Sequence, residues 1–175
     1  MFQAAHPEAE PGNRVVDLYS GHIHQHLAPK PSDNHYDNYI KQLDGVLQMA
    51  QGNVTCIHTV SDASAPSKGE LQVSLAFLVF RVQAKIAHII MTEGRATAPN
   101  MELMVLKISV ATALVAGCSS LVCFMDSMSA MLDLVDPSPH SGQGSSLAAC
   151  YALRQWFMGD VAQVLHLWHV PYKQE

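Results

Sequence analysis

Residues 121–127 read Leu-Val-Cys-Phe-Met-Asp-Ser, a run of five apolar side chains that ends directly at an acid. An uninterrupted apolar run of this length is typical of a strand that is buried on both faces. In open α/β sheets, ligand sites lie beyond the carboxyl ends of the strands. Asp126, which follows the predicted strand, is therefore the first candidate for a functional side chain.

The rest of the predicted sheet comes from four further stretches. Residues 54–60 form a β-branched strand that ends just before a second acid, Asp62. Residues 71–83 and 85–92 follow after short connections, which predicts an antiparallel meander. Residues 163–170 form the last strand, which a proline stops. We expect an α/β fold with a mixed five-stranded sheet, three antiparallel strands followed by two parallel ones, flanked by helices.

Helices are predicted between and beside these strands. Apolar residues recur at helical spacing over residues 100–116, with Asn100 as a plausible cap, and shorter helices are expected over 127–135 and 145–157. The face of the first helix that we expect to be buried consists of Met101, Met104, Val105, Ile108, Ala111, Thr112 and Val115.

Residues 1–53 are interpreted as an irregular N-terminal extension. Prolines and glycine punctuate its first part, and no sustained period is found there. One amphipathic helix, about residues 33–51, is expected within the extension. Residues 54–175 are then expected to form the folded domain.

Three histidines alternate near the start of the extension: His22, His24 and His26. In a strand they would share one face and could bind a metal. No carboxylate or cysteine partner lies near them in the sequence, however, and a solvated segment is the favoured interpretation.

Composition places the chain among globular proteins. Its 175 residues suit one domain, with 49% hydrophobic and 14% charged residues. The net charge of −5 argues against a strong nucleic-acid binder with a basic face. The four cysteines form no CxxC pair and lack zinc-ligand spacing, and no apolar signal peptide opens the chain. We expect a cytoplasmic or nuclear protein that is not secreted.

Residues 108–125 form an uncharged run of eighteen residues, which is the lower limit for a membrane-spanning helix. Serines, a threonine and a glycine interrupt this run. A buried helix, a turn and a buried strand explain it better, so no membrane association is expected.

A third acid, Glu102, lies in the first turn of the helix predicted over 100–116 and can point at the ends of both strands. Each acid alone fits a local role, such as capping a turn or complementing a helix N-terminus. Together, Asp62, Glu102 and Asp126 would repel one another unless a cation neutralises them. Mg²⁺ is the natural candidate because it prefers oxygen ligands. Two such ions about 4 Å apart can support phosphodiester cleavage.

The segments around the three acids carry a resemblance. Asp62 lies in Thr-Val-Ser-Asp-Ala-Ser-Ala, Glu102 in Asn-Met-Glu-Leu-Met and Asp126 in Phe-Met-Asp-Ser, and the acids are 40 and 24 residues apart. In this order and spacing, they resemble the type-one ribonuclease H domain over about residues 54–175. The loop and helix over 136–153 are similar to those of ribonuclease H domains in retrotransposon polyproteins.

This resemblance implies an activity and a set of site residues. The family cleaves the RNA strand of RNA–DNA hybrids with Mg²⁺ or Mn²⁺, reading minor-groove shape and the 2′-hydroxyl. The implied function is therefore a metal-dependent endonuclease that holds two ions. The resemblance implies Asp62, Glu102 and Asp126 as catalytic metal ligands, and Ser64, Asn100 and Ser127 as substrate contacts.

The sequence departs from the family pattern at three places. Ala63 replaces a usual glycine, and Lys173 stands near the place of a histidine that is thought to transfer protons. The family's fourth acid, on a closing helix, would come after residue 175. We therefore expect the last helix to be missing, and a reverse transcriptase or partner chain is a candidate to complete the fold.

These departures leave alternatives open. One is a catalytically inactive ribonuclease H-like module that binds nucleic acid or a protein. Another is a nuclease or integrase of the wider superfamily with a different substrate.

Overall fold

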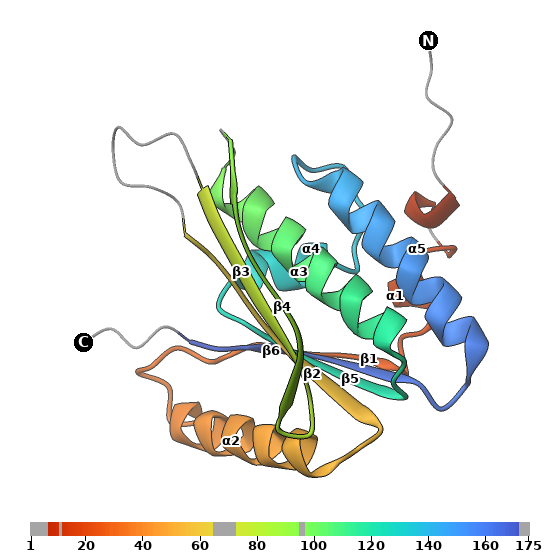
Figure 1. Ribbon diagram of the computed structural model, residues 1–175. Coiled ribbons are helices and arrows are strands. Elements are labelled where there is room, and N and C mark those ends of the chain that lie inside the picture. The colour runs from red at the N-terminus through yellow and green to blue at the C-terminus, as the bar shows by residue number, and fades with distance from the viewer. Residues whose placement is uncertain (1–6, 11, 65–72, 95–96, 172–175) are drawn as a thin grey trace.

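The computed structural model describes residues 7–10, 12–64, 73–94 and 97–171 (Figure 1). The elements before the sheet's long strands are η1 (Pro7–Ala9), α1 (Val15–Leu18), β1 (Ile23–His26) and α2 (Tyr36–Gly52). They are followed by β2 (Cys56–Ser64), β3 (Val73–Arg81), β4 (Ala84–Glu93), α3 (Ala98–Ala116), β5 (Ser120–Met125), α4 (Met128–Asp133), α5 (Gln143–Gly159) and β6 (Val164–His169).

These strands form one mixed sheet in the order β1-β6-β5-β2-β3-β4. The pairs β2–β3 and β3–β4 are antiparallel, and the pairs β2–β5, β5–β6 and β1–β6 are parallel. The expected α/β class and mixed sheet are confirmed.

The number of strands is six rather than the five expected, because β1 adds a parallel strand beside β6. It lies in the segment that was expected to be irregular. The sequence Ile-His-Gln-His of β1 has a single buried apolar residue, so its strand character comes from pairing rather than from a local pattern.

Helices cover both faces of the sheet. Helices α3, α4 and α5 lie on one face and α2 on the other (Figure 1). The larger core cluster fills the first face and includes Phe77, Leu106 and Leu153. A smaller cluster beneath α2 consists of Tyr39, Ala50, Cys56, Val122, Phe124 and Trp168, with further apolar residues of α2 packed against it. The helix expected over about 33–51 is thus observed as α2, and its apolar face is the one that packs on the sheet.

Helix α3 differs from expectation at its start and in the face that it buries. It begins at Ala98, with Pro99 in its first turn, so Asn100 lies inside the helix and does not cap it. The residues buried in α3 are Met101, Leu103, Val105, Leu106, Ser109, Val110 and Ala113. Of the described helices, α3 alone is long and apolar enough to cross a membrane by length and composition, and here it packs against β2, β3 and α5.

Candidate active site

The parallel pairing of β2 and β5 brings the first two acids together. Ser61 of β2 is level with Met125 of β5, and the next residue on each strand is an acid. Asp62 and Asp126 therefore lie at the same level, toward the carboxyl ends of two hydrogen-bonded neighbours. The sequence predicted that the first strand ends before Asp62, but β2 continues to Ser64 and pairs Asp62 with Ala76 of β3. The two acids can meet only if these strands are parallel neighbours. The sequence alone does not show this, because 63 residues lie between the two acids in the chain.

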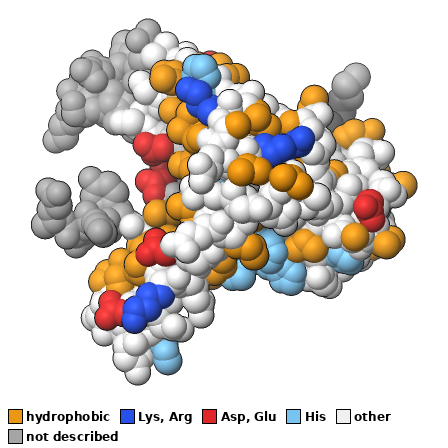
Figure 2. All heavy atoms as spheres, turned by 60° about the horizontal axis from the view of Figure 1, so that its bottom comes forward, with side chains coloured by type: hydrophobic (Ala, Val, Ile, Leu, Met, Phe, Trp, Pro, Cys, Tyr) orange, Lys and Arg blue, Asp and Glu red, His pale blue; other side chains and the backbone are white. Residues whose placement is uncertain are grey.

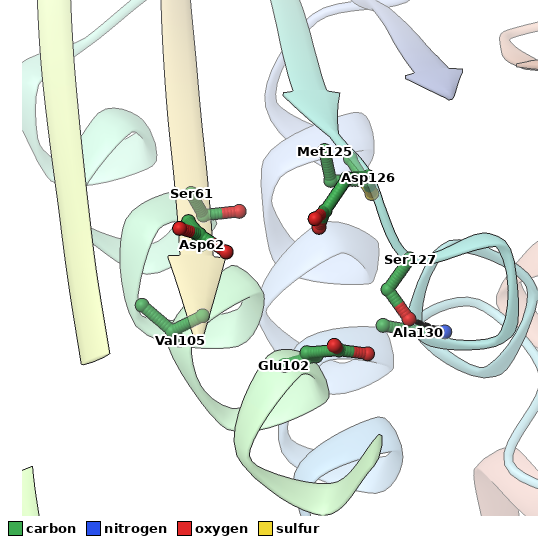
Figure 3. A pocket seen from close by; sticks show the side chains of 8 residues that line it. All are labelled: Ser61, Asp62, Glu102, Val105, Met125, Asp126, Ser127 and Ala130. Carbon is green, nitrogen blue, oxygen red and sulfur yellow. Dashed lines mark hydrogen bonds between the residues drawn. The ribbon is translucent and has the colours of Figure 1, made fainter. Parts of the chain in front are cut away.

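Glu102 reaches this end of the sheet from α3. The helix packs across β2, and because it begins at Ala98, Glu102 lies just beyond its first turn rather than within it as predicted. Its neighbours Met101 and Leu103 are buried in the core, which fixes the helix and leaves Glu102 on the side of the strand ends. Figure 3 shows Asp62, Asp126 and Glu102 around one recess, from β2, from the end of β5 and from α3.

The recess is polar on one side and apolar on the other. Its described lining consists of Ser61, Asp62, Glu102, Val105, Met125, Asp126, Ser127 and Ala130. This lining contains no lysine or arginine, so no protein cation neutralises the three carboxylates among these residues. The apolar part belongs to the core and holds the backbone that carries the acids.

Burial and repulsion between carboxylates both act on Glu102 and Asp126. Burial is the main cause that raises the pKa of Glu102, with Asp126 and Asp62 adding to the rise and hydrogen bonding by Ser127 opposing it. Burial also leads the rise in the pKa of Asp126, followed by repulsion from Asp62, while His169 opposes the rise. The site therefore disfavours its own negative charge, which a bound divalent cation would offset.

The donor chemistry of the recess fits a hard divalent cation. Carboxylate oxygens and the serine hydroxyls of Ser61 and Ser127 are the kind of oxygen ligands that Mg²⁺ and Mn²⁺ take. The three carboxylates do not converge on one point. Among the described residues, no three His, Cys, Asp or Glu side chains could hold a metal ion as they stand.

The other predicted site residues fall into separate groups. Ser127 lines the recess and caps α4, where its hydroxyl accepts a hydrogen bond from Ala130 N at 3.3 Å. Ser64 is exposed at the end of β2, outside the lining. The side-chain oxygen of Asn100 already accepts a hydrogen bond within the chain, from the hydroxyl of Ser141 at 2.7 Å. Lys173 lies outside the described residues.

His169 is a neighbour of the site that sequence reasoning missed. It ends β6 level with Met125, and its Nε2 lies 3.0 Å from the backbone oxygen of Asp126. The sequence showed His169 near the end of a predicted strand, but its closeness to Asp126 depends on the pairing of β6 with β5. The strand was predicted to continue to Val170, whereas β6 ends at His169.

No protein-family model and no curated protein matches the chain. Solved structures do. The N-terminal ribonuclease H domain of a Mycobacterium tuberculosis protein superposes with a TM-score of 0.50 and 20% identity, covering 66% of this chain and 88% of that one. The fold is ribonuclease H-like.

Two further solved structures also match the chain. A foamy viral protease–reverse transcriptase, solved in complex with an RNA/DNA hybrid, gives a TM-score of 0.52 at 8% identity, and the match covers 70% of this chain but 18% of that one. Ribonuclease H1 of Halobacterium salinarum gives 0.48 at 19% identity, covering 66% and 86%.

Proposed function

We propose that this chain is a metal-dependent endonuclease that hydrolyses the RNA strand of RNA–DNA hybrids. The observation that carries the proposal is the position of the three acids. Asp62, Glu102 and Asp126 line one recess at the carboxyl ends of two parallel neighbouring strands of a ribonuclease H-like sheet. That end of an α/β sheet is where ligand sites are built.

In this proposal, Asp62, Glu102 and Asp126 hold one or two Mg²⁺ or Mn²⁺ ions. When bound, such ions supply Lewis-acid activation of water and neutralise charge on the phosphodiester. The chain's own residues position these ligands. The cap by Ser127 fixes the start of α4 beside Asp126, and the His169 ring contacts the Asp126 backbone. Contacts of Ser64, Asn100 and Ser127 with substrate remain predictions.

The foamy viral structure supports the choice of substrate class. That enzyme was solved with an RNA/DNA hybrid, and it shares the fold of this chain. We include a retrotransposon context and a reverse transcriptase as partner in the proposal, on the resemblance of residues 136–153 described above. The net charge of −5 opposes nucleic-acid binding, and cations bound by the three acids would offset part of it.

The direct test is cleavage of an end-labelled RNA–DNA hybrid with Mg²⁺ or Mn²⁺, beside duplex DNA and single-stranded RNA of the same sequence. We expect metal-dependent cuts in the RNA strand of the hybrid and none in Asp126→Asn. Cutting of duplex DNA instead would indicate a nuclease of the wider superfamily.

A second candidate function is a binding module without turnover. The observation that favours it is the open arrangement of the acids, none of which combines with two others into a metal-holding group among the described residues. In that case a folded sample would shift the hybrid in a binding assay and leave it uncut at every Mg²⁺ and Mn²⁺ concentration.

A further inference from the structure

A second group of titratable side chains lies on β1 and β6, on the face of the sheet that α2 covers. His24 and His26 alternate on β1, and the parallel register sets His24 level with His166 of β6. The alternating pair therefore has a third histidine beside it, far away in the chain. We name His24, His26 and His166 the histidine cluster.

The cluster forms part of the surface beside the smaller core. The His26 ring stacks on Trp168 with centroids 3.8 Å apart, and Trp168 in turn packs against Tyr39 of α2. All three histidines are partly exposed. Figure 2, which brings the α2 side forward, shows histidine side chains gathered on this face among apolar ones. An ion can therefore reach the rings from solvent.

Two ring nitrogens of the cluster already have the spacing of metal ligands. His26 Nε2 and His166 Nδ1 lie 3.3 Å apart. Two nitrogens that bind one tetrahedral metal at about 2.0–2.1 Å lie about 3.4 Å from each other. Coordination requires only that the shared proton move to the other nitrogen of its own ring, which leaves both rings neutral.

The third ring is close but does not yet aim a nitrogen at the same point. Ring centroids are 4.8 Å apart for His24 and His166, 5.6 Å for His26 and His166, and 6.5 Å for His24 and His26. The rings lie within 31° of parallel. As they stand, no three His, Cys, Asp or Glu side chains of the described residues could hold a metal ion, so binding by all three rings requires His24 to rotate about its side-chain bonds.

The surroundings keep these rings in the form that binds metals. Burial lowers the pKa of His166 to about 4, with His24 and His26 adding to the effect. Burial likewise lowers the pKa of His26, again with His24 adding. Both rings are neutral near pH 7, and neutral imidazole is a ligand for Zn²⁺, Cu²⁺ and Ni²⁺ rather than for Mg²⁺.

We propose that His24, His26 and His166 bind a transition-metal ion, with Zn²⁺ as the physiological ligand and solvent in the remaining position. The ion would join β1 to β6 and so fasten the N-terminal segment to the edge of the sheet. This site does not depend on the proposed nuclease function, because it uses other residues and another class of metal.

The test is calorimetric titration of the full chain with Zn²⁺ at pH 7.5, in excess Mg²⁺ to occupy the acid recess. We expect one Zn²⁺ per chain, at least about tenfold weaker binding in His26→Gln and His166→Gln, and a smaller loss in His24→Gln. His22→Gln is the matched control, because its ring lies against Phe157 and its Nδ1 contacts Gln163 O. That variant should bind as the unaltered chain does.

A second readout uses the unaltered chain and needs no substitution in the cluster. Cu²⁺ or Ni²⁺ bound beside His26 should quench the fluorescence of the stacked Trp168 in a saturable way, and Zn²⁺ should compete. Asp126→Asn should leave both titrations unchanged. Absence of Zn²⁺ binding by the unaltered chain, equal binding by folded His166→Gln, or loss of binding in Asp126→Asn would each overturn the proposal.

Discussion

The acid recess and the histidine cluster are two groups of titratable side chains on one sheet, and they differ in how their charge is disfavoured. In the recess, the pKa values of Glu102 and Asp126 are raised, so the anionic form is the costly one. In the cluster, the pKa values of His26 and His166 are lowered, so the cationic form is the costly one. Burial is the leading cause in both.

This difference selects the kind of cation that each group suits. Crowded carboxylates gain from a hard, doubly charged ion that offsets their repulsion. Neutral imidazoles carry no charge that needs to be offset, and their nitrogen lone pairs suit a softer ion. One sheet thus presents two donor sets of different chemistry, and each can be altered without touching the other.

The largest expected effect is on cleavage. Asp126→Asn should lower hybrid cleavage by at least about a hundredfold, because one anionic ligand is removed from the recess. Initial rates on a labelled hybrid measure this loss. Asp44→Asn on the exposed side of α2 is the control and should retain the rate. A variant at Asp126 that cuts as fast as the unaltered chain would contradict the assignment of the recess.

The next effect is the pH dependence of stability. A histidine whose pKa falls on folding takes up less proton in the folded chain, so the free energy of unfolding should rise with pH between about 4 and 6.5. We expect a contribution on the order of 1 kcal/mol from His166, after allowing for solvent screening. Urea unfolding at pH 4.5, 5.5 and 7 tests it.

His166→Gln should flatten this part of the pH profile, whereas His22→Gln should keep its slope. An unchanged slope in His166→Gln would show that the cluster does not disfavour protonation.

Tyr39 lies between the two regions and allows a test of their independence. Its hydroxyl is within 2.8 Å of His26 O and 2.7 Å of His169 O, so one side chain of α2 touches the strand of the cluster and the strand end beside Asp126. Tyr39→Phe should lower the free energy of unfolding by about 1 kcal/mol. Chemical denaturation measures the loss, with the exposed Tyr151→Phe as control.

The same variant sharpens the comparison of the two sites. If Tyr39→Phe weakens both Zn²⁺ binding and hybrid cleavage, then α2 positions both groups. If neither changes, the sites are independent and Tyr39 serves stability alone.

The smallest expected effect concerns the repulsion in the recess. Carboxyls with raised pKa values hold protons more tightly when folded, so their contribution to stability falls as pH rises through those values. With chelator present at pH 7, Asp126→Asn should gain a few tenths of a kcal/mol, because solvent screens these partly exposed groups. Thermal melting tests the sign, and the gain should shrink as the pH falls toward the ordinary aspartate pKa of 3.8. A loss of stability at pH 7 would contradict repulsion.

Local sequence patterns predicted most of the helices and strands. They failed to predict the buried face of a helix whose faces are all similarly apolar. The expected buried face of α3 included Val115, which is 90% exposed, and omitted Leu106 and Val110, which are buried. Apolar side chains lie on all sides of this helix, so its sequence alone does not show which side packs against the rest of the protein. Its contacts with β2, β3 and α5 make that choice.

Strand β1 shows the opposite failure. Its alternating histidines were noticed, but a four-residue strand at the edge of a sheet has too little apolar pattern to be distinguished from a solvated segment. Its pairing with β6 supplies both its backbone hydrogen bonds and the third histidine. Neither follows from residues 22–26 alone.

The sequence by itself determined which segments form most of the strands and helices, because apolar runs and helical periodicity are local features. It also singled out Asp126 after an apolar run, Asp62 near the end of another predicted strand and Glu102 in a predicted helix, as candidates for one site. Only the tertiary structure decided which segments become neighbours. The parallel pairings of β2 with β5 and of β1 with β6 join residues up to 142 positions apart, and such pairing depends on packing of the whole sheet rather than on any one stretch.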